Sequence, residues 1–224
     1  MVWYLASQTN HHVDNISDEW QTYYVTMLTK KETPMNSNDL LKELHVMQQS
    51  YATLFSVVNK VQIRGDENLE VLTSRQHMAL VAIAHLPLEQ TTLMNIAKKL
   101  GTSKQTANKL ISGLEKKGYI ETLPSRLDKR AINVRITPKG EEALIVCSEK
   151  STYFLADMFH EFNAEELHTF WRLLRKLYRF DGEEQDGFEE HANLEVGEVS
   201  EPMESFQERV LSEFSKRRYG GANT

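Results

Sequence analysis

The run SKQTANKLISGLEKKG, at residues 103–118, carries amide and ammonium groups at helical spacing. At about 100° per residue, a helix here separates an apolar side from a polar side. The apolar side holds Ala107, Leu110, Ile111 and Leu114, and the polar side holds Gln105, Asn108, Lys109, Ser112 and Lys116. We expect the polar side to be exposed, with no acids and no large apolar groups. Amides suit base edges and ammonium groups suit phosphates, so this face favours DNA as a ligand.

The start of this helix offers a second way to bind an anion. Ser103 is expected to cap it, and the free backbone amides near Lys104 and Gln105 form a positive end that can hold a DNA phosphate. An ordinary amphipathic helix is the alternative reading, but its polar face would carry acids about as often as bases. The predicted DNA contacts from this helix are Ser103, Lys104, Gln105, Thr106, Asn108 and Lys109.

A basic hairpin follows in the stretch ETLPSRLDKRAINVRITPKG. Residues 119–123 and 131–136 are predicted strands, and the second alternates apolar with polar residues as a half-buried strand does. The loop between them offers Arg126, Lys129 and Arg130. An arginine on a narrow protruding loop fits the DNA minor groove, where the potential is most negative. These three residues extend the predicted DNA-binding surface.

Charge is unevenly distributed along the chain. The 224 residues have a formal net charge of −6. Residues 95–140 contain eleven Lys or Arg and three Asp or Glu, a local charge of +8 that leaves −14 for the remainder. A solvated surface usually mixes its signs, so this excess favours an anionic partner over a merely hydrated face. Residues 181–201 contain nine acids and no Lys or Arg, which is typical of a linker or disordered tail.

Capping residues and apolar periodicity divide most of the chain into helices. Thr73–Gln76 has capping-box form, Thr137 followed by Pro138 opens a helix, and Gly65 is an expected helix end. The expected helices cover residues 38–64, 73–86, 92–100, 103–117, 138–162 and 163–182, with a short one at 202–218. A turn containing Gly101 separates two of them, which is helix-turn-helix geometry. The fold class is therefore mainly α with a small β-hairpin.

The run from Leu72 to Ala143 resembles the winged helix-turn-helix of the multiple antibiotic resistance regulators (MarR). The resemblance lies in LTSRQHMAL, IAKKLGTSKQTANKLISGLEKKGYI and SRLDKRAINVRITPKGEEAL. A helix-turn-helix followed by LEKKGYI is common to several winged-helix families, whereas DKR followed by a strand ending in ITPKG is more specific. The resemblance extends more weakly over 38–64 and 138–180, and both ends of the chain lie outside it.

The resemblance implies a winged helix-turn-helix plus a helical dimerisation layer, in a homodimer that binds double-stranded DNA. The recognition helix would enter the major groove and the wing the adjacent minor groove. Arg130 matches the wing arginine of the family, and Asp128 matches the aspartate that orients it through a salt bridge. The usual output is repression, relieved by a small ligand or by oxidation. The apolar stripes outside the wing domain exceed what one such domain could cover, which favours a dimer independently.

Three segments are therefore expected. They are an N-terminal extension at 1–36, a MarR-like domain at 37–182, and an acidic linker with a short C-terminal helix at 183–224. The MarR-like domain would comprise the winged helix-turn-helix at about 72–140 and dimerisation helices at about 38–64 and 138–180.

Other classes of protein are disfavoured. No nucleophile motif or phosphate-cradling glycine loop indicates an enzyme or a cofactor, and the eight histidines form no tight metal-ligand motif. The one cysteine, Cys147, excludes an internal disulfide framework and indicates the cytoplasm. It lies on an apolar stripe, which favours a packing thiol over a redox switch. No apolar run is long enough to span a membrane.

A protein-interaction module is the alternative function. In that reading, the winged helix or the acidic tail would mainly contact another protein. The basic hairpin favours the DNA-binding regulator, whereas the acidic tail leaves room for a protein partner as an added feature.

Overall fold

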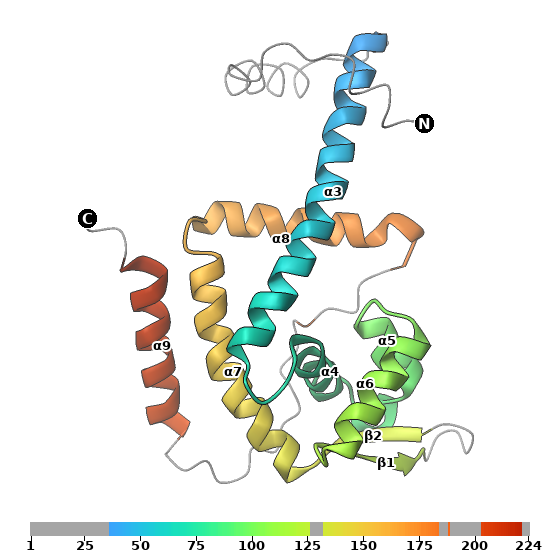
Figure 1. The fold of residues 1–224 in the computed structure, drawn as a ribbon, viewed down its shortest axis with the longest axis vertical. Coiled ribbons are helices and arrows are strands. Elements are labelled where there is room, and N and C mark those ends of the chain that lie inside the picture. The colour runs from blue at the N-terminus through green and yellow to red at the C-terminus, as the bar shows by residue number, and fades with distance from the viewer. Residues whose placement is uncertain (1–35, 126–131, 184–187, 189–202, 221–224) are drawn as a thin grey trace. The chain divides into compact units, whose positions relative to one another are not determined.

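The computed structural model describes residues 36–125, 132–183, 188 and 203–220. This part of the chain is mainly α with one two-stranded antiparallel hairpin (Figure 1), which confirms the expected fold class. The helices are α3 (Ser37–Asn68), α4 (Ser74–Ala84), α5 (Leu93–Lys99), α6 (Lys104–Lys116), α7 (Pro138–Met158), α8 (Ala164–Tyr178) and α9 (Met203–Tyr219). The strands are β1 (Ile120–Pro124) and β2 (Ile132–Ile136), and two 3-10 helices are η1 (Leu88–Gln90) and η2 (Arg179–Asp181).

The chain divides into two compact units, residues 1–60 and 61–224. In the first unit, the described residues form the N-terminal part of α3. The carboxamide of Asn36 accepts hydrogen bonds from the backbone amides of Asn38 and Asp39 at 2.9 and 3.0 Å. Asn36 therefore caps this helix, since it satisfies amides that have no partner in the first turn.

In the second unit, α4, α5, α6 and the hairpin form the winged helix-turn-helix (Figure 1). The side chains of Thr73, Thr92 and Ser103 cap the three helices, each accepting a bond from the backbone amide three residues on. These caps confirm the predicted helix starts. Gly118 has a φ of +74°, so it turns the chain from the end of α6 towards β1.

One apolar cluster joins these elements. Leu80 of α4, Ile96 of α5 and Leu114 of α6 are fully buried in it, and Ile120 and Val134 contribute from the hairpin. Burying each such side chain stabilises the fold by about 1.5–3 kcal/mol. The shared core therefore holds the polar side of α6 at a set position relative to the hairpin.

The prediction that Gly65 ends α3 is wrong, because the helix continues to Asn68. Gly65 is buried, and a Cβ placed on it would lie 2.3 Å from Ser74 Oγ. Ser74 Oγ donates to the Gln62 carbonyl at 3.3 Å, and the Ser74 amide donates to Asp66 Oδ1 at 2.6 Å. Gly65 therefore allows α4 to pack closely against the end of α3, and it does not end the helix.

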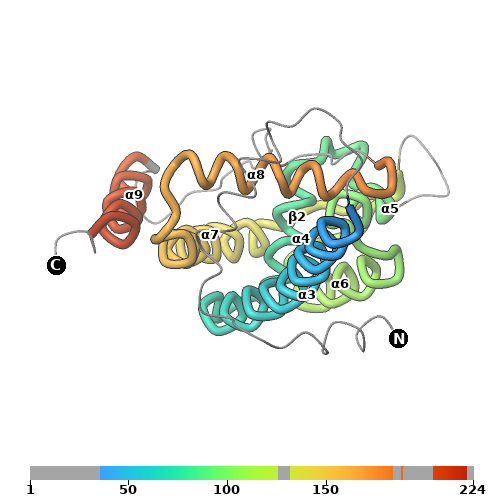
Figure 2. Tube along the Cα trace, turned by 90° about the horizontal axis from the view of Figure 1, so that it is seen from above, coloured from blue at the N-terminus to red at the C-terminus, as the bar shows by residue number. Residues whose placement is uncertain are grey.

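Helix α7 begins at the predicted Thr137 cap and Pro138, but it ends at Met158 rather than Phe162. Residues 159–163, here called the α7–α8 corner, join it to α8. Asn163 caps α8 in the predicted capping box, accepting from the Glu166 amide at 2.9 Å. Figure 1 shows α8 leaving this corner across the direction of α7, and α9 lies beside α7 in both Figure 1 and Figure 2.

Cys147 is fully buried in the core of the second unit. Burial raises the pKa of its thiol, and Sγ lies 3.9 Å from the Leu69 carbonyl oxygen. A buried thiol with a raised pKa forms little thiolate, which is the nucleophilic form. The structure therefore supports the packing role predicted for this residue.

We expect Cys147 not to react with a water-soluble disulfide reagent while the protein is folded. Thiol release followed at 412 nm, about the absorbance maximum of the released thiolate, should rise to about one equivalent only after urea is added. The urea-unfolded protein serves as the reactive control. Rapid reaction of the native protein would mean that the thiol is accessible to oxidants.

His77 on α4 is a buried ionisable group with an incomplete set of hydrogen bonds. Its side chain is 8% exposed, and Nε2 contacts no hydrogen-bonding atom among the residues that the structure describes. Burial lowers its pKa, because the charged form loses its hydration. The unfolded chain thus binds a proton more readily than the folded chain, so stability should fall as the pH drops below about 6.5.

Replacing His77 by leucine should remove this part of the pH dependence. Urea unfolding at pH 7.5 and pH 5.5, roughly either side of the unfolded pKa, should show a smaller loss of stability for the variant than for the wild type. An equal loss in both proteins would place the pH dependence in other groups. Both are compared at one protein concentration, so that association affects them equally.

Candidate nucleic-acid interface

The turn between α5 and α6 is held by backbone hydrogen bonds and one glycine. The amides of Gly101 and Thr102 donate to the Lys98 and Ala97 carbonyls, both at 3.0 Å. Gly101 has a φ of +59°, a conformation that costs other residues about 1–2 kcal/mol. The Tyr178 hydroxyl at the end of α8 also donates to the Lys98 carbonyl, at 3.3 Å. Helix α8 therefore supports the turn, a contact that no local sequence pattern indicated.

The N-terminus of α6 has the predicted geometry for anion binding. Ser103 Oγ accepts from the Thr106 amide at 3.2 Å and lies 3.0 Å from Thr106 Oγ1. Thr106 is half-buried and completes the cap, whereas Ser103, Lys104 and Gln105 are exposed. The amides of the first turn thus face solvent beside an exposed lysine and a glutamine. This arrangement suits a phosphate or the floor of a groove.

The polar side of α6 projects as predicted. Asn108 and Lys109 are exposed, as is Lys116 at the end of the helix, whereas Ala107 and Ile111 on the opposite side are buried. All six site residues predicted on this helix are therefore brought together on or beside one surface. Rigid placement on a helix suits base recognition, since the distance between donor groups is fixed before binding.

The expectation that the polar side of α6 carries no acids is wrong at its edge. Glu115, in the last turn, is exposed, and its Oε1 accepts a hydrogen bond from Thr122 Oγ1 on β1 at 2.7 Å. This contact holds the carboxylate towards the hairpin. Glu115 therefore lies at the edge of the polar side, away from the helix start.

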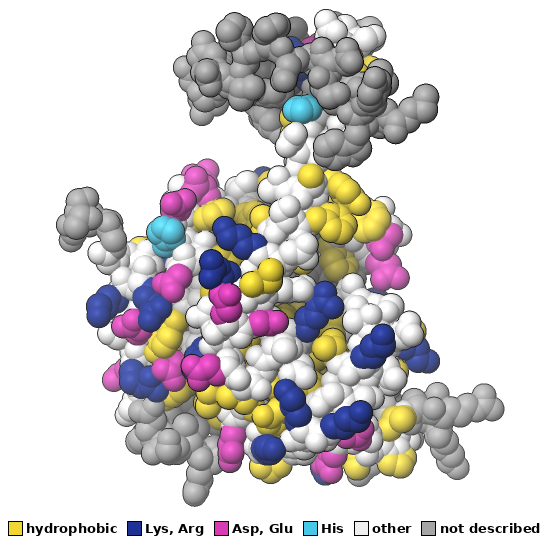
Figure 3. All heavy atoms as spheres, viewed as in Figure 1, with side chains coloured by type: hydrophobic (Ala, Val, Ile, Leu, Met, Phe, Trp, Pro, Cys, Tyr) yellow, Lys and Arg dark blue, Asp and Glu magenta, His cyan; other side chains and the backbone are white. Residues whose placement is uncertain are grey.

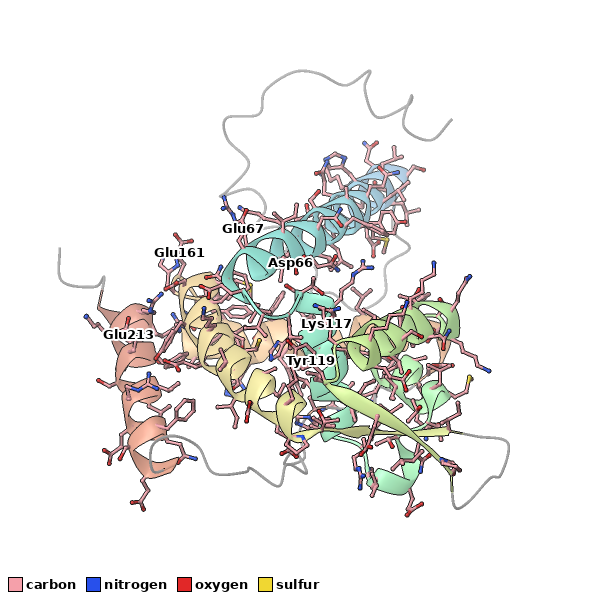
Figure 4. All side chains as sticks on the ribbon, turned by 60° about the horizontal axis from the view of Figure 1, so that its bottom comes forward. Asp66, Glu67, Lys117, Tyr119, Glu161 and Glu213 are labelled. Atoms are coloured by element: carbon pink, nitrogen blue, oxygen red, sulfur yellow. The ribbon has the colours of Figure 1, made fainter. Side chains whose placement is uncertain are left out.

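The end of α6 is tied to its neighbours through two lysines. Lys117 Nζ donates to Gln76 Oε1 at 3.0 Å, which links α6 to α4. Lys139 Nζ donates to the Lys117 carbonyl at 2.8 Å and lies 5.0 Å from the centre of the Tyr119 ring. Figure 4 labels Lys117 and Tyr119 at this junction. These two lysines stabilise the domain, although their charges also add to the local potential.

Some of the basic residues counted in residues 95–140 are buried or paired, so the exposed basic surface is smaller than that count suggests. Lys99 is buried, with Nζ 5.2 Å from the ring centre of Phe188, and Arg135 pairs with Glu121 at 2.5 Å. Figure 3 shows Lys and Arg side chains over the α6 and hairpin side of the second unit, with carboxylates near its lower edge. The cations best placed for a ligand are therefore those on the polar side of α6.

The hairpin pairs Ile120 with Ile136 and Pro124 with Ile132 in antiparallel register. Its predicted tip residues Arg126, Asp128, Lys129 and Arg130 lie outside the described residues. The strands project from the core beside α6 (Figure 1), so the loop that joins them starts next to the same surface. Their placement supports the name wing for this hairpin.

The predicted alternation of β2 is wrong at two positions, because Ile132 is exposed and Asn133 is buried. Asn133 forms a bridge with Thr92, and its Nδ2 donates to the Leu88 carbonyl at 3.1 Å. The Val134 amide donates to the Thr91 carbonyl at 3.0 Å. The segment before α5 thus pairs with β2 through an isolated bridge, which attaches the wing to the helix-turn-helix.

The rest of the described structure gives little indication of another kind of site. In residues 36–125, 132–183, 188 and 203–220, no three His, Cys, Asp or Glu side chains gather as metal ligands would. None of the helices described is both long and apolar enough to cross a membrane.

Part of this chain is similar in sequence to known proteins. A model described as MarR family matches residues 72–131. The chain is 28% identical over 90 residues to an uncharacterized HTH-type transcriptional regulator, YsmB, of Bacillus subtilis (strain 168), which covers 40% of this chain and 62% of the relative. It is 29% identical over 111 residues to the transcriptional repressor MprA of Escherichia coli (strain K12), covering 49% and 63%. The matches thus span less than two thirds of these relatives.

The fold of the chain is also similar to that of a solved structure. A crystal structure of an S. aureus MepR–DNA complex superimposes with a TM-score of 0.52 at 22% identity, covering 57% of this chain and 94% of that one. At this identity the likeness shows the fold alone. It identifies the arrangement of α4–α6 and the hairpin as a winged helix-turn-helix of this type.

Proposed function

Since residues 72–131 of this chain match the MarR family model, we propose that it is a sequence-specific DNA-binding transcriptional regulator of that family. The observation that carries the proposal is the exposed polar side of α6, which presents Lys104, Gln105, Asn108 and Lys109 from one rigid helix. The transcriptional repressor MprA, 29% identical over the matched 111 residues, supports the same function. Regulation by a winged helix needs no catalytic group, so we propose no enzymatic activity.

In this proposal, α6 lies in the major groove with its N-terminus towards the bases. Gln105 and Asn108 read base edges, while Lys104 and Lys109 bind phosphates or guanine. Ser103 and Thr106 hold the cap, and they leave the next amides free for a phosphate. The wing, with Arg130 aimed by Asp128, reaches the adjacent minor groove, where an arginine is favoured by the negative potential.

We propose a homodimer because helix α8 is largely unpartnered. None of its residues is buried, and its exposed apolar side chains form a broad surface. They are Phe170, Trp171, Leu173, Leu174 and Leu177, with Phe180 following in η2. A patch of this kind in a soluble chain indicates an interface, and a second copy gives two recognition helices for two half-sites.

The N-terminal part of α3, in the other unit, has the same character. Its exposed apolar side chains are Leu40, Leu41, Leu44, Met47, Tyr51, Phe55, Val57 and Val58. A helix with this many exposed apolar side chains needs another protein surface to bury them. We propose that α3 joins α8 in the dimer layer of a repressor that binds a pseudo-palindromic operator. A small-molecule effector and a cytoplasmic location complete this proposal.

The test needs no knowledge of the operator. Binding of the full chain to a random duplex, measured from about 50 to 200 mM salt, should weaken linearly on a log–log scale. The double variant Lys104→Ala and Lys109→Ala should bind less tightly, with a slope shallower by roughly one for each phosphate that a lysine no longer neutralises. Lys216→Ala, an exposed lysine on α9, is the matched control. Equal slopes for all three proteins would exclude this face as the DNA-binding surface.

A further inference from the structure

Helix α9 attaches to α7 mainly through charged groups. Arg209 pairs with Glu149 through both guanidinium nitrogens, one at 3.3 Å. Arg217 pairs with Asp157 at 2.9 Å and with Glu213 of its own helix at 2.8 Å. The hydrogen bond from Arg209 is the main cause that lowers the pKa of Glu149. These pairs place α9 in one register along α7.

Apolar packing between the two helices is sparse. Val210 is buried, but Leu211, next in the sequence, is 63% exposed. An open hollow of about 320 Å³ lies between Ser148 and Thr152 of α7 and Phe206 of α9. The apolar side chains of α9 that are at least half-buried are Val210, Phe206 and Phe214, and exposed ion pairs usually contribute only about 0–1 kcal/mol each. Stability of the core does not explain why α9 lies here.

Arg218, near the end of α9, makes a different kind of contact. Unlike its neighbours it is buried, with 8% of its surface exposed. Its Nη1 donates to the His160 carbonyl at 2.7 Å, and its Nη2 donates to the Phe162 carbonyl. Both carbonyls belong to the α7–α8 corner, after the last residue of α7. Carbonyls at a helix end lack partners within the helix, so one guanidinium satisfies two of them.

The position of this contact links it to α8. Phe162 is followed directly by Asn163, the cap of α8, and Phe162 also packs against Phe170 with ring centres 5.9 Å apart. Figure 4 shows Glu161 in this corner and Glu213 on α9. A helix of 15 residues extends about 22 Å, and α8 is held at both ends, by the corner at its start and by the Tyr178 bond to the Lys98 carbonyl at its end, so the corner sets the direction in which α8 leaves α7.

We infer that α9 is a positioning element for the dimer layer, with Arg218 as the residue that holds the α7–α8 corner and thereby directs α8. The inference rests on the proposed homodimer, since α8 carries the proposed interface. Arg218 acts through the corner and touches neither DNA nor the exposed apolar face of α8. The ion pairs of Arg209 and Arg217 are separate contacts between α9 and α7, so the loss of one of them should leave Arg218 at the corner.

The test is the dimer dissociation constant of the full-length chain, measured by sedimentation at fixed salt. Arg218→Ala should raise this constant about tenfold or more, because the variant cannot make the two charge-assisted hydrogen bonds to the corner. Arg218→Lys replaces the two donating nitrogens by one ammonium nitrogen, which can bond to one of the two carbonyls, and should give a rise of about threefold. Arg217→Ala weakens the attachment of α9 without touching the corner carbonyls and should change the constant less than twofold. Lys216→Ala, with its side chain 79% exposed, is the unchanged control.

Two results would overturn the inference. One is a dissociation constant unchanged in both Arg218 variants, and the other is an equal rise in Arg217→Ala and Arg218→Ala. If the alanine variant does not fold, as judged by circular dichroism, the lysine variant decides, and an unchanged constant there overturns the inference. A wild-type chain that stays monomeric contradicts the proposed homodimer as well, whereas a wild-type dimer that is insensitive to Arg218 contradicts this inference alone.

Discussion

Replacing Arg130 by alanine is expected to weaken operator binding by about 1–3 kcal/mol and to change base preference at the outer edge of each half-site. In the proposed complex, the wing whose strands are held by the core would present Arg130 to the groove next to the one that α6 enters. A guanidinium in a narrow minor groove is favoured by the strong negative potential there. Loss of that group removes both affinity and sensitivity to groove width.

The measurement compares the affinities of the wild type and of Arg130→Ala for an operator obtained by selection. It also compares them for operators with changed bases where the wing would bind. Arg64→Ala is the matched control, because this exposed arginine pairs with Glu67 on α3 and lies outside the proposed DNA-binding surface of α6 and the wing. Lys116→Ala provides a contrast: if this lysine touches phosphate, binding should weaken across all sequences and the salt slope should fall by about one. Unchanged affinity and preference in Arg130→Ala would remove the wing from the proposed interface.

Replacing Leu174 by aspartate is expected to convert the dimer into monomers over the micromolar range. Leu174 lies in the exposed apolar row of α8, and a dimer would bury it with little access to water. An unpaired carboxylate in an apolar interface costs several kcal/mol, which corresponds to a rise of at least roughly 100-fold in the dissociation constant. Operator binding should then fall steeply, since one recognition helix alone makes few base contacts.

Sedimentation of the variant at several concentrations checks this result. Leu211→Asp is the control, since this leucine of α9 is also exposed and lies outside the proposed dimer face. Circular dichroism should show that both variants keep their helices. A Leu174→Asp variant that remains dimeric would mean that α8 does not form the dimer interface.

Much of the winged helix-turn-helix could be predicted, because its signals are local. Thr73, Ser103 and Asn163 cap helices at the predicted positions, since a cap is specified by a few neighbouring residues. The two sides of α6 also followed from helical periodicity, which does not depend on the partner elements. The expected fold class is confirmed, and the MarR family model matches residues 72–131 within the same region.

The errors occurred where distant parts of the chain decide the environment of a residue. Gly65 allows Ser74 to pack closely against α3 and does not end the helix. Asn133 is buried because the Leu88 carbonyl, 45 residues earlier in the chain, accepts its hydrogen bond. Tyr178 and Arg218 reach carbonyls 80 and 58 residues away. Periodicity and capping signals contain no information on such contacts, which depend on tertiary packing.

Genome-wide capture of DNA bound by the native protein in its own cell tests the central claim most directly. The proposed homodimer predicts enriched sites with two-fold symmetry, whose half-sites are separated by roughly one helical turn so that two α6 helices can enter successive major grooves. Each half-site should be flanked by a position sensitive to Arg130. Recovery of no enriched sites, or of sites without symmetry, would contradict the proposal that this chain regulates genes as a DNA-binding dimer.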